Sequence, residues 1–124
     1  MKKLSPSELE IMQVIWRDGS LSVKQLLTAI NRSRPQPITR TTVLKQVQRL
    51  EVFGYLQRDD SRPALYSALV LEKDATQALT RDFAHQVFGG SPLKMVRSFF
   101  DDEKLKPSEV EELKELIRKL DSES

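Results

Sequence analysis

The apolar residues of the first half of the chain recur at intervals of three and four, the period of an amphipathic helix, in three successive segments. This pattern predicts helices at about 5–18, 22–31 and 39–53. Each begins with a hydroxyl residue that can cap its first turn: Ser5, Ser22 and Thr39. The sequence Arg34-Pro35-Gln36-Pro37 cannot continue a helix, because proline lacks an amide N–H and restrains the residue before it. A turn therefore separates the second helix from the third.

Two strand-like segments follow the third helix. Residues 55–58 alternate between apolar and polar, residues 59–63 have the composition of a turn, and a second strand-like run lies within 64–71. Leu21 is a candidate for a very short extra strand. The fold predicted is mainly α with a small β-hairpin, and its order of helix, helix, helix and hairpin is that of a winged helix-turn-helix module. In such modules the helix before the hairpin enters the DNA major groove.

The region around the third helix has no carboxylate. Asp18 and Glu51 bound this stretch, and six basic residues fall between them: Lys24, Arg32, Arg34, Arg40, Lys45 and Arg49. On a helical projection Val43, Val47 and Leu50 face the core, and the opposite side is polar. Threonine and glutamine can hydrogen-bond base edges, and arginine can pair with guanine. We therefore expect DNA contacts from Arg40, Thr41, Thr42, Lys45, Gln48 and Arg49, the alternative being an ordinary solvated helix face.

Two further arginines lie near the tip of the predicted hairpin. Arg58 and Arg62 are candidates for contacts to phosphate or to the minor groove. The alternative is that they pair with Asp59 or Asp60.

The two parts of the chain carry opposite charge. Residues 1–71 hold eleven Lys and Arg against six Asp and Glu, whereas residues 72–124 hold nine against twelve. This asymmetry is typical of a nucleic-acid module joined to a protein-contact module, although a difference of this size also arises by chance. We therefore predict a DNA-binding domain at 1–71 and a helical dimerisation domain at 72–124.

Three more amphipathic helices are predicted in the second part, over about 72–88, 91–100 and 107–120. About fifty residues with three apolar stripes cannot readily bury them alone, so a second copy of the chain is expected to cover them. The candidate dimer contacts are Leu79, Phe83, Val96, Phe99, Leu113, Ile117 and Leu120. An intrachain core would use the same residues. The glutamates at 109–115 indicate a solvated helix face.

Several functional classes find little support. The chain has no cysteine and a single histidine, His85, and it has no Gly-rich phosphate loop, so neither a catalytic set nor a metal site or cofactor is predicted. Its aromatic residues Trp16, Phe53, Tyr55 and Tyr66 fall on apolar faces and are expected to pack in a core rather than stack on bases. No run approaches the ~20 apolar residues of a membrane span, and the start lacks a signal-peptide h-region. A cytoplasmic protein with no membrane partner is expected.

With these segments in place, the chain resembles the BlaI/MecI family of bacterial repressors, also called the penicillinase repressor family, which includes the copper-responsive CopY branch. The resemblance runs almost end to end. It rests on LSPSELEIMQVIW, TRTTVLKQVQRLEVFGYL, LYSALV, GGSPLKMVRSFF and LKPSEVEELKELI. It implies a dimeric, sequence-specific DNA-binding repressor that binds a palindromic operator in duplex DNA through the helix at 39–53. The family's Thr-Val and Arg-Leu pairs match Thr42-Val43 and Arg49-Leu50.

The chain also departs from the family pattern. Phe53-Gly54 stands where the family often has Lys-Gly, so one phosphate contact is expected to be absent. Ser98-Phe99 stands where β-lactam-responsive members are cleaved at Asn-Phe, and the cysteine cluster of the copper branch is missing. Neither induction route is therefore expected, and no residue pattern identifies another inducer or upstream sensor. The alternative function is a winged-helix protein-interaction module, for which an acidic third helix would be as expected as a basic one.

Overall fold

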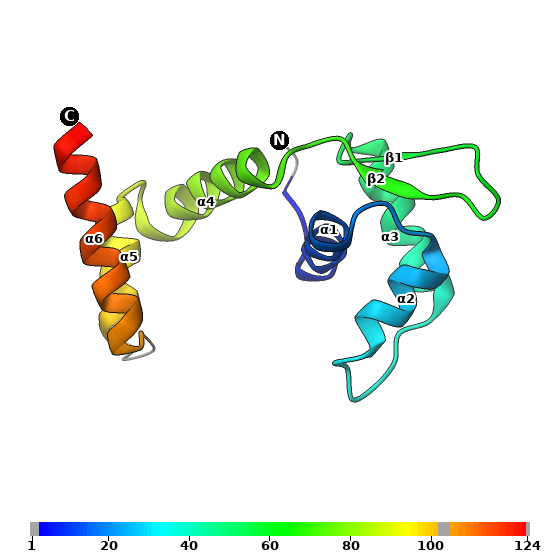
Figure 1. The fold of residues 1–124 in the computed structure, drawn as a ribbon, viewed down its shortest axis with the longest axis horizontal. Helices are drawn as coiled ribbons and strands as arrows, with labels where there is room; N and C mark the ends of the chain where they lie inside the picture. The colour runs from blue at the N-terminus through cyan, green and yellow to red at the C-terminus, as the bar shows by residue number, and fades with distance from the viewer. Residues whose placement is uncertain (1–2, 102–104, 124) are drawn as a thin grey trace. The chain divides into compact units, whose positions relative to one another are not determined.

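The computed structural model describes residues 3–101 and 105–123. The elements in chain order are α1 (Pro6–Asp18), α2 (Val23–Asn31), α3 (Arg40–Val52), β1 (Leu56–Arg58), β2 (Tyr66–Ala68), α4 (Glu72–Phe88), α5 (Pro92–Asp101) and α6 (Pro107–Glu123) (Figure 1). The mainly helical architecture with one antiparallel hairpin confirms the predicted fold class. The chain forms two compact units, residues 1–79 and 80–124.

The first two helices begin as their sequences predict. The Ser5 hydroxyl accepts a hydrogen bond from the amide of Glu8, and the Glu8 carboxylate accepts one from the amide of Ser5. Together these two hydrogen bonds form a capping box. Ser22 and Gln25 form the same reciprocal pair at the start of α2. These contacts satisfy amides that have no partner within the helix.

The turn between α2 and α3 is held by side chains that the local pattern did not reveal. The amide group of Asn31 donates to the carbonyl oxygen of Ile38 at 3.2 Å and accepts from its N–H at 3.0 Å. Arg34, within the turn, forms a 2.6 Å ion pair with Glu10 of α1. The start of α3 is therefore fixed against both preceding helices, and Thr39 caps it by accepting from the amide of Thr42.

The exit from α3 sets the position of the hairpin. Gly54 adopts a left-handed φ of 84°, which favours glycine, and the amide of Tyr55 donates back to the Leu50 carbonyl at 2.9 Å. The Tyr55 amide thus satisfies a carbonyl in the last turn of α3, and β1 begins one residue later than the sequence pattern indicated. Leu56 pairs with Ala68 and Arg58 with Tyr66. The predicted extra strand at Leu21 is present as a bridge to Tyr66.

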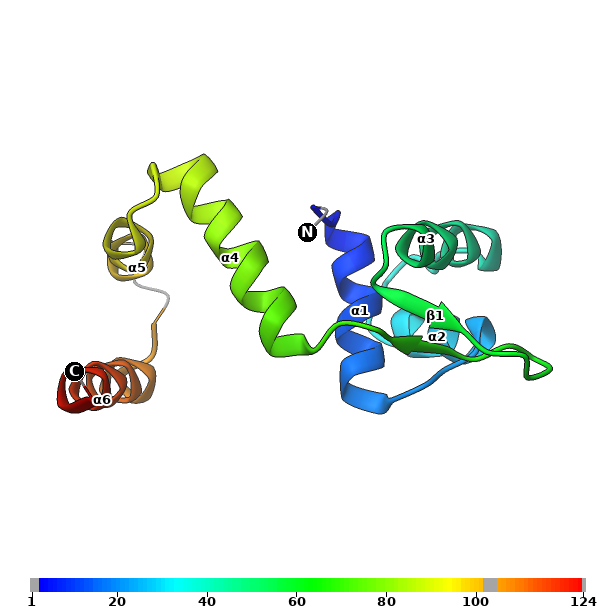
Figure 2. The same ribbon diagram turned by 90° about the horizontal axis from the view of Figure 1, so that it is seen from above.

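Residues 3–79 of the first unit contain a continuous apolar core. Ile11, Met12, Leu26, Val43 and Val47 have no exposed surface. The aromatic side chains predicted to pack do so, because Tyr55 and Tyr66 are buried and Trp16 and Phe53 pack at the edge of the core. The Trp16 indole N–H also donates to the carbonyl of Val70 at 2.9 Å. In both views the loop between β1 and β2 projects beyond the helices of this unit (Figures 1 and 2).

In the second unit, α5 and α6 lie side by side (Figures 1 and 2). Gly89 and Gly90 end α4 with positive φ angles, and a side chain at Gly90 would meet the His85 ring at 3.1 Å. Ser91 caps α5 by accepting from the amide of Lys94. The glutamates at 109–115 are exposed as expected, and Glu111 and Glu115 pair with Lys114 and Arg118 one turn later.

The first compact unit extends eight residues beyond Leu71, the boundary expected from the sequence, because Ala75 is buried in its core and Leu79 packs against that core. The assignment of DNA binding to residues 1–71 and of dimerisation to residues 72–124 stays a prediction. None of the helices within residues 3–101 and 105–123 has the length and apolar character needed to cross a bilayer.

Candidate nucleic-acid interface

The outward face of α3 is polar, basic and exposed. Val43, Val47 and Leu50 are fully buried, so the opposite face of the helix is directed to solvent. All eight residues predicted to contact DNA have exposed side chains: Arg40, Thr41, Thr42, Lys45, Gln48, Arg49, Arg58 and Arg62. Their accessibility is consistent with DNA contact, although the role of each residue remains a prediction.

One threonine of this face has part of its hydrogen-bonding capacity committed. The hydroxyl groups of Thr39 and Thr42 lie 3.0 Å apart, and the Thr39 hydroxyl also caps the helix. Thr41 has no such contact with the cap. Of the two threonines predicted to contact DNA, Thr41 therefore has the hydroxyl group that is not engaged with Thr39.

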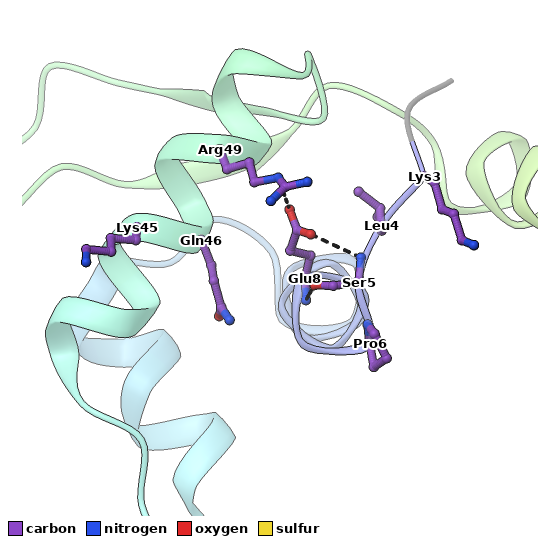
Figure 3. Close-up of a pocket in the computed structure, with 8 residues that line it drawn as sticks. All are labelled: Lys3, Leu4, Ser5, Pro6, Glu8, Lys45, Gln46 and Arg49. Atoms are coloured by element: carbon purple, nitrogen blue, oxygen red, sulfur yellow. Dashed lines mark hydrogen bonds and ion pairs between the residues drawn. The ribbon is translucent and has the colours of Figure 1, made fainter.

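One flank of α3 meets the beginning of α1. A depression of about 550 Å³ lies between the two helices, lined on one side by Lys3, Ser5 and Glu8 and on the other by Lys45, Gln46 and Arg49. In Figure 3 the Arg49 side chain is directed toward Glu8, whereas Lys3 and Lys45 point away from it. The Arg49 Nε lies 3.3 Å from Oε2 of Glu8, so the two groups form an ion pair. Their geometry is not that of a hydrogen bond. Sequence spacing could not reveal this contact, because it joins side chains 41 positions apart.

The same arginine also contacts an aromatic ring. The Arg49 guanidinium carbon lies 5.0 Å from the centroid of Phe53, one turn further along α3. Phe53 is the position at which the resemblance led us to expect the loss of a lysine. The Phe53 ring therefore contacts a neighbouring cation, Arg49, at a position where the family often has a second cation.

The opposite flank of α3 carries a second basic cluster. Lys24 at the start of α2, Arg40 of α3 and Arg58 of β1 line a depression of about 330 Å³, together with Ser22 and Tyr66. Lys24 lies in the acid-free stretch but was not among the predicted DNA contacts. Its position beside two predicted contacts makes it a further candidate.

The hairpin loop is organised by Asp59. Its carboxylate accepts hydrogen bonds from the amides of Ser61 and Leu65 at 3.0 and 2.9 Å, and from the Ser61 hydroxyl at 3.0 Å. The bonds from Leu65 and then Ser61 hold the pKa of the Asp59 carboxyl below its ordinary value. Neither Arg58 nor Arg62 forms an ion pair with a residue that the structure describes. The alternative, in which these arginines pair with Asp59 or Asp60, is therefore not observed.

The candidate dimer residues differ in their surroundings. Val96, Phe99 and Leu113 line an apolar groove of about 270 Å³ between α5 and α6, which is bordered by Glu109 and Glu112. Phe83 is half exposed and packs edge-on against Phe88, whereas Leu79 packs against the core of the first unit. The side chains of Ile117 and Leu120 lie outside the described residues.

No group of three side chains suited to metal binding occurs among the residues described. His85 packs against Gly90.

The family profile described as "Penicillinase repressor" matches residues 4–119. The chain belongs to the penicillinase repressor family. The methicillin resistance regulatory protein MecI of Mammaliicoccus sciuri is 27% identical to it over 118 residues, which is 94% of each chain. The penicillinase repressor of Bacillus licheniformis is 24% identical over 121 residues, covering 94% of this chain and 93% of that relative. The BlaI/MecI assignment made from sequence is thus confirmed, while a relation to the CopY branch stays a prediction.

Solved structures support the winged-helix fold of this family member. Monomeric BlaI of Bacillus licheniformis, solved in complex with a half-operator, has a TM-score of 0.50 and 24% identity and covers 59% of this chain and 88% of its own. A multiple antibiotic-resistance repressor, MarR, from Listeria monocytogenes has a TM-score of 0.51 and 20% identity, with coverage of 96% and 74%. At these identities the likeness concerns the fold.

Proposed function

We propose that this chain is a transcriptional repressor that binds duplex DNA by inserting α3 into the major groove. The observation that carries the proposal is the surface of α3: an exposed face free of carboxylates, set between two basic clusters. An α-helix fits the major groove, and a basic face there replaces the counterions of the phosphates. Family membership supports the same function, as does the half-operator bound by the BlaI relative.

The position of each side chain suggests its role. Thr41, Lys45 and Gln48 lie on the outward face and would contact base edges. Lys24, Arg40 and Arg58 flank that face and would contact phosphates, which set affinity and its salt dependence. Arg62, at the hairpin loop, would reach phosphate or the adjacent minor groove.

A second part of the proposal is a symmetric homodimer that binds a palindromic operator. The apolar groove between α5 and α6 leaves Phe99 50% exposed and Leu116 57% exposed, and a second copy would remove this surface from water. Two-fold symmetry of the protein would match half-sites separated by about one helical turn, roughly 34–36 Å, or a multiple of it. The expectation that the protein is cytoplasmic accords with this function.

The test uses duplexes that the wild-type chain selects from a randomised pool. Lys45→Glu combined with Gln48→Glu places two carboxylates on the outward face without changing a buried residue. Binding in a mobility shift assay should fall at least a hundredfold, and wild-type affinity should fall steeply with salt. The matched control is Lys73→Glu with Arg81→Glu on the exposed face of α4, which adds a larger negative charge on a different helix. Binding that is unchanged in the first variant would refute the assignment of α3.

A further inference from the structure

Arg49 is restrained from two sides while its side chain remains exposed. The Nε atom pairs with Glu8 of α1 (Figure 3). On another side the guanidinium carbon lies 5.0 Å from the centroid of the Phe53 ring. The side chain nevertheless keeps 61% of its surface accessible. A free surface arginine would sample many rotamers, whereas these two contacts restrict this one.

The charge of Glu8 is not required for helix capping, as a comparison within the molecule shows. Gln25 completes the capping box of α2 with a neutral side chain, through the same two hydrogen bonds that Glu8 forms at α1. Glu8 is nevertheless ionisable and only 2% exposed, and burial of an unpaired charge is costly. Its Oε1 atom serves the cap, while Oε2 lacks a hydrogen-bond donor and faces Arg49. The second oxygen is therefore placed for the arginine.

The geometry of the pair leaves the recognition end of the arginine free. Glu8 engages the Nε side of the guanidinium group, and no hydrogen bond joins either terminal nitrogen to another residue that the structure describes. Terminal nitrogens are the pair that binds guanine O6 and N7 in the end-on bidentate geometry. An arginine already fixed in this orientation loses less rotational entropy when it binds.

We propose that Glu8 is a positioning residue for sequence recognition, which holds Arg49 so that its terminal nitrogens contact a guanine in the major groove. The proposal rests on the proposed insertion of α3 into DNA. Glu8 itself does not touch DNA. One oxygen of Glu8 completes the capping box of α1, and the other orients the side chain of Arg49 on α3.

The charge of Glu8 is expected to affect non-specific and specific DNA binding in opposite directions. A buried carboxylate next to a DNA-binding face opposes sequence-independent attraction to phosphates while it favours the orientation needed for base recognition. Removal of its charge should therefore strengthen binding to unrelated DNA, or leave it unchanged, and at the same time weaken discrimination. A purely structural role would lower both affinities together.

The test is Glu8→Gln, which keeps the side-chain volume and the oxygen that accepts from Ser5. Affinities of the full chain are measured for a duplex selected by the wild type and for a scrambled duplex of the same composition. We expect discrimination between the two to fall about tenfold, the size of one bidentate contact, with no loss of affinity for the scrambled duplex. Replacing guanine by 7-deazaguanine in the selected duplex should weaken wild-type binding more than that of the variant.

A double-mutant cycle with Arg49→Ala separates positioning from other effects. If Glu8 acts through Arg49, Glu8→Gln should cause no further loss of discrimination in the Arg49→Ala background. Asp18→Asn is the matched control, because it removes a different α1 ion pair, with Arg17 at the other end of the helix, and should leave discrimination unchanged. An equal loss of affinity for both duplexes, or an additive effect in the cycle, would overturn the proposal. Absence of DNA binding by the wild type would instead refute the proposed function.

Discussion

The two compact units bury their apolar side chains to different extents. In the first unit, α1, α2 and α3 bury theirs against one another, and Ile11, Leu26 and Val47 are inaccessible to water. In the second, α5 has no buried residue, and Leu93 and Phe99 keep 67% and 50% of their surfaces exposed. Helices of similar periodicity thus form a complete core in one unit and an open apolar surface in the other.

The difference concerns what each unit needs in order to be stable. Three helices and a hairpin enclose a core, so the first unit should hold its shape as a monomer and present α3 rigidly. Two adjacent helices have too little mutual surface to cover both apolar stripes. Stability of the second unit should therefore depend on protein concentration, as expected where a second copy supplies the missing contacts.

The largest expected difference between the units is the cost of truncating an apolar side chain. Leu26→Ala should lower the free energy of unfolding by about 2–5 kcal/mol, because it leaves a cavity in a closed core. Leu93→Ala on exposed α5 should cost less than about 1 kcal/mol. Urea unfolding followed by circular dichroism measures both. Equal costs would mean that the second unit is as well packed as the first.

The next prediction concerns self-association. Phe99→Glu places a charge in the groove between α5 and α6 and should weaken association of two copies by about a hundredfold or more, since a buried unpaired charge is costly. Lys94→Gln, on the exposed side of the same helix, is the matched control. Sedimentation equilibrium at micromolar concentration supplies the measurement. A wild-type chain that is monomeric both free and bound to DNA would remove the dimer from the proposal.

The features that the sequence predicted well are local. Both capping boxes depend on residues three positions apart, and the end of α3 depends on Gly54, so the helices and their order follow from short-range patterns. The exposed face of α3 follows from helical period alone. The six α3 side chains expected to contact DNA are accessible for this reason, and the role of each stays a prediction.

The features that were missed depend on distant contacts. Glu8 meets Arg49 only after α1 and α3 have packed, and Glu10 meets Arg34 in the same way. The Asn31 contacts with Ile38 span a proline-containing turn whose path no periodicity predicts. Leu79, whose spacing fits the α4 stripe, packs on the core of the first unit, and its place in a dimer contact stays a prediction. A stripe identifies what is buried but not its partner.

A smaller effect is expected from helix caps, and here too the units should differ. Ser22→Ala removes a largely buried cap of α2 and should cost about 1 kcal/mol of stability. Ser91→Ala removes the exposed cap of α5, whose 3.3 Å hydrogen bond is long, and should cost about half as much or less. Thermal unfolding of the two variants against wild type makes the comparison. A larger loss from Ser91 would show that α5 is held more by its cap than by packing.

The smallest effect should come from acid, and it should be confined to the hairpin loop of the first unit. Hydrogen bonds from Leu65 and Ser61 lower the folded-state pKa of Asp59, so the loop has its full stabilisation above the ordinary aspartate pKa of about 3.9 and loses it as the pH falls through the lower folded-state value. Amide resonances of Ser61 and Leu65 should shift together over that range.

Asp59→Asn should reproduce the loosened loop at neutral pH, while Asp60→Asn should not, because Asp60 does not form these hydrogen bonds. Because Arg62 lies in the same loop, Asp59→Asn should also weaken DNA binding by a few-fold, a loss far below that from changing the face of α3. A loop that keeps its amide shifts in Asp59→Asn would show that the backbone alone defines its conformation.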